Sequence, residues 1–200
     1  MKLIVITTEN FFESEAEAID QLFENGLSLL HIRKPRASYD ETESFIKQIK
    51  TDFRPRVVLH DYNDLAELYG LKGIHLNLRN QANRDKVHFK LSISRSCHSL
   101  EDVAESQTCD YVFLSPVFDS ISKAGYKQAF TPQQLEEAKQ RKAINKKVIA
   151  LGGIKTENIP VVRQYGFGGV AVLGALWRDF IVDRNVDELL KRFNALKNTL

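Results

Sequence analysis

The sequence predicts one domain, spanning residues 1–200, that folds as a closed (β/α)8 barrel of the TIM type. Eight short apolar runs rich in β-branched residues recur at a spacing of roughly 25 residues. Helical patterns alternate with these runs, which indicates parallel strands joined by right-handed crossovers. An open doubly wound sheet is the alternative, but its usual phosphate loop follows the first strand, and the turn at 7–10 contains no glycine. The closed barrel is therefore favoured.

Four strand and helix units occupy the first half of the chain. Two capping boxes, Ser14-x-x-Glu17 and Ser38-x-x-Glu41, predict the starts of the first two helices. A polar segment after the fourth strand gives no clear helix start. The four predicted strands are 2–8, 27–33, 56–60 and 73–76.

The second half repeats the pattern. Ser99-x-x-Asp102 is a further capping box, and Thr131-Pro132 opens another helix after a long loop. An amphipathic helix over 183–196 closes the chain. The four predicted strands of this half are 91–94, 110–115, 148–154 and 168–175.

Composition limits the classes of function. The chain has 200 residues, 43% of them hydrophobic, and a formal charge of +2 with basic and acidic residues interleaved. This balance does not indicate a basic surface of the kind that binds nucleic acid or an anionic membrane. The longest apolar runs are far below the roughly 20 residues of a membrane span. Cys97 and Cys109 lack CxxC spacing, so two reduced thiols are expected. The sequence thus predicts a soluble, cytoplasmic protein with small-molecule partners, and leaves assembly as a homo-oligomer open.

Two glycine turns near the end of the chain predict a phosphate site. Gly152 and Gly153 end the seventh strand, and Gly174 ends the eighth, each before a helix start. Glycine lets the backbone approach a ligand, and the first N–H groups of a helix supply donors and partial positive charge. In a (β/α)8 barrel, the loops after strands seven and eight often form such a site. The alternative is that these glycines only make tight turns.

In a barrel, the active site lies at the carboxyl ends of the strands. Arg33 and Lys34 suit an anion such as diphosphate, although such a pair is often only a solvated edge. Asp61 is an oxygen ligand suited to Mg²⁺, and it could equally cap the following helix. The polar residues at the strand ends are His31, Arg33, Lys34, His60, Asp61, His75, Asn80, Ser96, His98, Ser115, Ser120, Ser122 and Lys123.

The remaining candidates have simpler alternatives. Lys123, with Ser120 and Ser122, forms a donor cluster for phosphate or carboxylate oxygens, unless it is a surface lysine on a flexible lid. His75 lies within a strand, which favours a hydrogen-bonded core residue over a catalytic base. His98 is expected to order the loop before a helix.

Several motifs together resemble one family. They are Gly73-Ile-His-Leu76, Ser94-Arg-Ser-Cys-His-Ser99, the segment 110–123, Ala150-Leu-Gly-Gly-Ile154 and Gly169-Val-Ala-Val172. In order and spacing they resemble thiamine-phosphate synthase and its thiazole tautomerase relatives, over nearly the whole chain. The resemblance implies a transferase that joins hydroxymethylpyrimidine diphosphate to a thiazole phosphate and releases diphosphate, assisted by Mg²⁺.

The resemblance also implies roles for individual residues. Arg33 and Lys123 would hold diphosphate, and Ser96 the pyrimidine, which makes these three the expected catalytic residues. His31, Lys34 and His60 would line the substrate site. The implied thiazole and metal contacts are Ser120 and Ser122 for the thiazole, Gly153, Leu173 and Gly174 for its phosphate, and Asp61 and Asn80 for the metal.

Four positions depart from the family pattern. His31 replaces a glutamine, and His60 an asparagine. Pro35 replaces a lysine, so that Lys34 is displaced by one residue, and a side chain pointing to solvent is the alternative to one in the substrate site. Asn80 replaces the second metal-binding aspartate, which implies a weaker Mg²⁺ site and weaker activity. Two alternatives therefore stay open: a tautomerase-type enzyme acting on the thiazole phosphate, and a non-catalytic binder of thiamine-pathway phosphates.

Overall fold

Eight parallel strands close into one barrel in the computed structural model, which describes residues 1–77, 91–119 and 129–200. The strands pair in chain order, and β1 closes the ring by pairing with β8, with Lys2 opposite Gly169. The closed barrel predicted from the sequence is confirmed, and the open sheet is not. The strands are β1 Lys2–Ile6, β2 Leu29–Ile32, β3 Val57–Leu59, β4 Gly73–Leu76, β5 Ser92–Cys97, β6 Tyr111–Leu114, β7 Val148–Leu151 and β8 Gly169–Val172.

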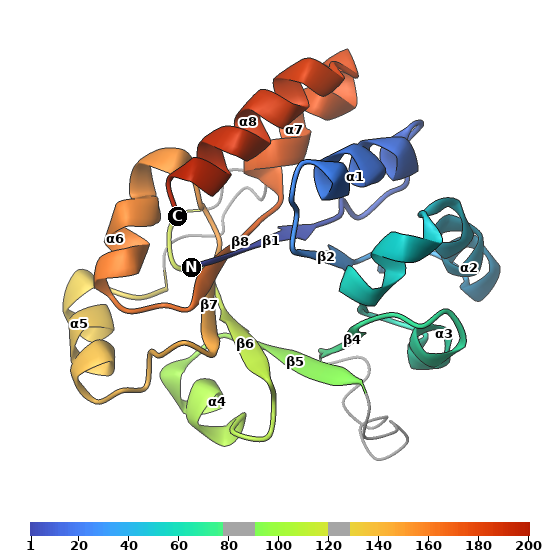
Figure 1. The fold of residues 1–200 in the computed structure, drawn as a ribbon. Helices are drawn as coiled ribbons and strands as arrows, with labels where there is room; N and C mark the ends of the chain where they lie inside the picture. The colour runs from blue at the N-terminus through green and yellow to red at the C-terminus, as the bar shows by residue number, and fades with distance from the viewer. Residues whose placement is uncertain (78–90, 120–128) are drawn as a thin grey trace.

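Helices surround these strands (Figure 1), and α8 packs against both α7 and α1. Between Lys50 and β3 the chain forms a short 3-10 helix, η1. Among the described residues, no helix has the length and apolar character needed to cross a membrane. The helices are α1 Glu15–Glu24, α2 Tyr39–Gln48, η1 Thr51–Arg56, α3 Asn63–Leu68, α4 Leu100–Glu105, α5 Pro132–Gln140, η3 Thr156–Asn158, α6 Ile159–Gln164, α7 Gly174–Asp183 and α8 Val186–Asn198.

Local sequence signals predicted the starts of three helices, α2, α4 and α5. The capping boxes at Ser38 and Ser99 form as predicted, and Thr131 caps α5 with Pro132 at its first position. The box predicted at Ser14 is wrong: Ser14 precedes α1 with a φ of 61° and makes no side-chain cap. The predicted closing helix begins later than expected, because Asp183 ends α7 and Arg184 takes a left-handed conformation.

Alternate residues of each strand face two separate cores, as the period of a β-strand requires. Leu3 and Val5 of β1, for example, belong to the large core between the strands and the helices, whereas Ile4 and Ile6 face the barrel interior. The interior cluster is apolar and consists of Ile4, Ile6, Tyr111, Phe113, Ile149 and Ala171. On β2 to β5, by the same alternation, the interior positions include His31, His60, His75, Ser94 and Ser96.

Candidate active site at the carboxyl ends of the strands

A buried chain of hydrogen bonds runs through the polar part of the barrel interior. His31 of β2 lies with Nδ1 3.0 Å from Nε2 of His60, and with Nε2 2.6 Å from the hydroxyl of Tyr111. All three side chains are buried. Burial lowers the pKa of His31 well below its usual value, and nearby His75 adds to the shift. His31 is therefore neutral at physiological pH, and it links two strands on one side of the barrel to β6 on the other.

His75 of β4 is held between two serines of β5. Its Nδ1 lies 2.8 Å from Oγ of Ser94, and its Nε2 lies 2.8 Å from Oγ of Ser96. Burial lowers the pKa of His75 to about 3, with a further contribution from the positive charge of Arg33. The prediction that His75 is a hydrogen-bonded core residue is confirmed. Because Ser96 is only half-buried, His75 fixes a hydroxyl that reaches the more open part of the interior.

Arg33 follows β2 at the carboxyl end of the barrel. Its backbone N–H donates to Oγ1 of Thr7 at 2.9 Å, which ties the end of β2 to the end of β1. Its guanidinium Nη1 donates to Glu9 at 2.7 Å, and the side chain keeps 24% of its surface exposed. A guanidinium has five N–H donors, so a carboxylate on one edge leaves donors for an anion on another. Arg33 therefore lies where an anionic substrate group could reach it.

Lys34 has a different place from the one expected. Instead of pointing to solvent, its Nζ lies within 2.8 Å and 2.7 Å of the two carboxylate oxygens of Glu15 and 2.9 Å from the carbonyl oxygen of Asn10. The side chains of Lys34 and Glu15 are each 1% exposed, and the ammonium also lies 4.7 Å from the centre of the Phe11 ring. Since an ammonium has three N–H donors and three acceptors surround it here, Lys34 holds the loop after β1 against α1 rather than facing a substrate.

The ion pair between Lys34 and Glu15 also explains why the predicted cap at Ser14 does not form. Burial raises the pKa of Glu15 to about 7, while Lys34 opposes that rise. Burial likewise lowers the pKa of Lys34, and Glu15 opposes that fall. Two such groups are stable in an apolar setting only as a pair. The first turn of α1 is therefore anchored by this ion pair, in place of a serine cap.

Asp61 lies two residues after β3, half-buried at the same end of the barrel. The N-cap position of α3 is occupied by Tyr62, in a left-handed conformation and without a side-chain cap, so the predicted alternative that Asp61 is the N-cap residue is wrong. A carboxylate oxygen fits Mg²⁺, which commonly takes one or two carboxylates together with substrate phosphates and waters. The neighbouring His60 offers nitrogen, which Mg²⁺ does not favour. Within the described ranges, Asp61 is thus the implied metal ligand whose chemistry fits.

The two glycine turns differ in structure. Gly152 and Gly153 have φ angles of 98° and 61°, and a Cβ on Gly153 would meet the carbonyl oxygen of Asp119 at 2.3 Å. Close packing against the segment after β6 therefore requires glycine there. Gly174 is the first residue of α7, and Leu173 before it has no side-chain cap. The first N–H groups of this ten-residue helix point away from its body, as a phosphate site needs.

Four predicted residues lie outside the described residues: Asn80, Ser120, Ser122 and Lys123. Sequence reasoning missed Tyr111 and Ser94, whose side chains complete the interior hydrogen bonds, and Glu9, which pairs with Arg33. Strand alternation was the signal available for Tyr111 and Ser94, since both occupy interior positions.

Comparisons with known proteins identify the family. Residues 3–176 match the family described as thiamine monophosphate synthase. A thiamine-phosphate synthase of Koribacter versatilis is 30% identical over 170 residues, which cover 82% of this chain and 78% of that protein. The crystal structure of thiamine phosphate pyrophosphorylase from Bacteroides thetaiotaomicron superposes with a TM-score of 0.88 at 39% identity, covering 100% of this chain and 97% of that one. The chain therefore belongs to the thiamine monophosphate synthase family and is a transferase of thiamine biosynthesis.

Proposed function

We propose that this chain forms thiamine phosphate by joining hydroxymethylpyrimidine diphosphate to a thiazole phosphate. The observation that carries the proposal is the family match over residues 3–176, which spans all eight strands and the residues at their carboxyl ends. The named relatives are synthases, so the tautomerase-type and non-catalytic alternatives are not favoured. Small-molecule substrates and a cytoplasmic location are parts of the same proposal.

The proposed reaction is a substitution at the methylene carbon of the pyrimidine. The bond from this carbon to the diphosphate oxygen breaks, and its electron pair leaves with diphosphate. The ring nitrogen of the thiazole then supplies the pair for the new carbon–nitrogen bond. Because charge builds on the departing diphosphate, catalysis rests on positioning the substrates and stabilising an anion.

The diphosphate is assigned to the side of the barrel after β2 and β3. Arg33 offers guanidinium donors there, and the carboxylate of Glu9 restrains their direction. Asp61 would hold Mg²⁺, which when bound neutralises diphosphate charge. Lys123 is proposed for the same group on the basis of the family resemblance, and Asn80 for the metal.

The two organic substrates are assigned to the interior and to the start of α7. The hydroxyl of Ser96, oriented by His75, is proposed to bind the pyrimidine, next to the imidazoles of His31 and His60. The phosphate of the thiazole is proposed to lie at the N–H groups near Gly174, whose helix dipole favours an anion. Gly153 is proposed to shape this site through its backbone, and Ser120 and Ser122 to contact the thiazole.

The experiment is formation of thiamine phosphate by the purified chain, with both substrates, with one omitted, and with and without Mg²⁺. Product is expected only when both substrates and Mg²⁺ are present. Arg33→Ala should lower kcat/KM by about 10²-fold, as for the loss of one contact to developing charge. Arg36→Ala is the matched control, because its side chain is 74% exposed on the same loop. Thiazole phosphate converted without the pyrimidine would support the tautomerase-type alternative, and binding without any turnover would support a non-catalytic binder.

A further inference from the structure

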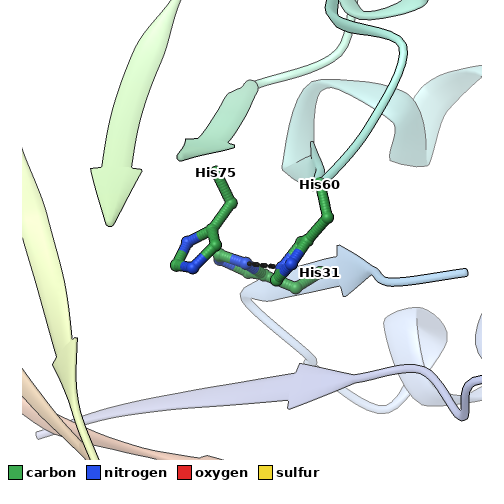
Figure 2. A group of neighbouring side chains, drawn as sticks. All are labelled: His31, His60 and His75. Carbon is green, nitrogen blue, oxygen red and sulfur yellow. Dashed lines mark hydrogen bonds between the residues drawn. The ribbon is translucent and has the colours of Figure 1, made fainter. Parts of the chain in front are cut away.

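Three histidines on neighbouring strands meet inside the barrel. His31 lies on β2, His60 directly after β3 and His75 on β4, and Figure 2 shows their side chains pointing toward one another. All three are buried, and one ring nitrogen from each lies within 4.8 Å of the others. We call His31, His60 and His75 the histidine triad. The proposed transfer reaction gives these residues no role in making or breaking a bond, so it does not explain why three imidazoles meet here.

Hydrogen bonds fix the direction of two of the rings. The hydroxyl of Tyr111 holds Nε2 of His31 at 2.6 Å, which turns Nδ1 of His31 toward Nε2 of His60 at 3.0 Å. Ser94 holds Nδ1 of His75 at 2.8 Å, while Nε2 of His75 is bound to Ser96 at 2.8 Å and can face a metal only after that contact breaks. Histidines that bind metals usually have their second ring nitrogen fixed by such a partner, which sets the tautomer and the direction of the ring.

We propose that the histidine triad binds one Zn²⁺ ion. Three imidazole nitrogens suit zinc and the neighbouring transition metals, whereas Mg²⁺ prefers oxygen. Tetrahedral zinc has zinc–nitrogen bonds of about 2.0–2.1 Å, so its ligand nitrogens lie about 3.3 Å apart. The His31 and His60 nitrogens, 3.0 Å apart, are already near this spacing. The site is separate in chemistry from the Mg²⁺ site proposed at Asp61, and it shares His75 with the proposed pyrimidine site at Ser96.

Zn²⁺ binding requires protons to move only within each ring. An imidazole that carries one N–H has one lone pair to give to a metal. On binding, each lone pair faces the metal and the N–H moves to the other nitrogen. In His31 it then donates to the Tyr111 hydroxyl, and in His75 to Oγ of Ser94. The ring of His75 stacks on that of His60 at 4.2 Å between centres, and its Nε2 is bound to Ser96, so His75 must rotate and give up its contact to Ser96 before Nε2 can face the metal. The fourth position of the ion would be left for water or a substrate group.

The test is metal binding by the purified, chelator-treated chain. Zn²⁺ titration calorimetry should give one site per chain, and Co²⁺ in its place should give the visible spectrum of a tetrahedral nitrogen site. Excess Mg²⁺ should not displace either ion. His60→Asn and His75→Gln, which keep hydrogen-bonding side chains, should each weaken Zn²⁺ binding by more than about 100-fold, because a lost ligand costs more than a lost supporting contact. Tyr111→Phe, which removes only such a contact, should cost about 10–100-fold.

His98→Gln is the matched control, because this exposed histidine binds the carbonyl oxygen of Ser115 and lies outside the triad. It should bind Zn²⁺ as tightly as the unchanged chain. Circular dichroism establishes that each variant folds, and X-ray absorption of the zinc-loaded unchanged chain counts the imidazoles without any variant. Three imidazoles are expected. No binding, fewer than three imidazoles, displacement by Mg²⁺, or equal losses in His98→Gln would overturn the proposal, leaving the triad as a hydrogen-bonded polar core only.

Discussion

The barrel interior is apolar on the side of β1, β6, β7 and β8, and polar on the side of β2 to β5. Ile4, Phe113 and Ile149 fill the apolar side, whereas His31 and His75 with their hydrogen-bond partners fill the polar side. Both sides are buried, but apolar side chains gain stability simply from leaving water, and polar ones must each find a partner. The same closed sheet thus has a side suited to holding the fold and a side suited to orienting polar groups.

Arg33 and Lys34, which are adjacent in the sequence, also differ in their exposure to solvent. Arg33 stays partly exposed at the mouth of the barrel, paired with Glu9, while Lys34 is buried against Glu15. A strand sends successive side chains to opposite faces, and that alternation continues through the first residues of this loop. Charge alone therefore says little about which of two neighbouring cations reaches a substrate.

The largest expected effect is a loss of stability on the apolar side. Phe113 is fully buried, and its ring lies 4.8 Å from that of His31 and 4.9 Å from that of His75. Phe113→Ala should cost about 3–5 kcal/mol of unfolding free energy, through lost burial and the cavity left behind. Urea denaturation measures this, with Phe113→Leu as a smaller change. A loss of unfolding free energy below about 1 kcal/mol would contradict the claim that the apolar side stabilises the fold.

Acid should weaken the polar side next. The folded pKa of His31 and of His75 lies below the usual 6.5, so below pH 6.5 the unfolded chain takes up protons that the folded chain does not. The stability that neutral His75 contributes is therefore complete above pH 6.5 and is lost as the pH falls toward 3. His75 should cost about 1.4 kcal/mol per pH unit in that window, and neutral His31 adds a loss in the same direction.

Urea denaturation of the metal-free chain across this range checks the prediction. His75→Gln should reduce the slope of stability against pH. A slope that is the same in this variant and in the unchanged chain would show that other groups dominate the acid response.

Ser96→Ala should affect activity much more than stability. The hydroxyl lies 2.8 Å from His75 and is proposed to bind the pyrimidine. Its loss is expected to lower kcat/KM by about 10²-fold, while unfolding free energy changes by about 1 kcal/mol, the value of one hydrogen bond. Ser92→Ala is the matched control, since Ser92 lies at the opposite end of β5 and contacts Asp110. Equal kinetic losses in the two variants would contradict the assignment of Ser96.

The smallest expected effect concerns phosphate. Gly174→Asp would place a carboxylate at the start of α7, and thiazole phosphate should bind about tenfold more weakly, a difference of about 1.4 kcal/mol. Gly174→Ala adds a methyl group without charge and should weaken binding less. Unchanged affinity of the aspartate variant by calorimetry would remove this helix start from the phosphate site.

Local and periodic signals made the fold predictable. The capping boxes at Ser38 and Ser99 depend on contacts within four residues, and the eight strands follow from apolar runs repeated along the chain. The capping box predicted at Ser14 does not form. The neighbouring Glu15 instead pairs with Lys34, which is distant in the sequence, and no local sequence pattern indicates that contact.

Placement of candidate residues at the ends of strands was the part of the site that the sequence predicted. The structure places Arg33, Asp61 and the glycine turns just after β2, β3, β7 and β8, and their roles in the site stay predictions. The pairing of His31 with Tyr111 joins residues 80 positions apart and depends on how far each strand is shifted along the barrel. Register of that kind follows from packing of the whole sheet, so the sequence identified the histidines but not their meeting point.

The measurement that tests the central claim most directly is the ratio of diphosphate released to thiamine phosphate formed by the purified chain with both substrates and Mg²⁺. Both products are counted in the same samples over the course of the reaction. One diphosphate for each thiamine phosphate, with neither product when the thiazole phosphate is omitted, is the predicted result. Diphosphate released without thiamine phosphate, or no diphosphate at all while thiazole phosphate still binds, would contradict the assignment of this chain as the transferase.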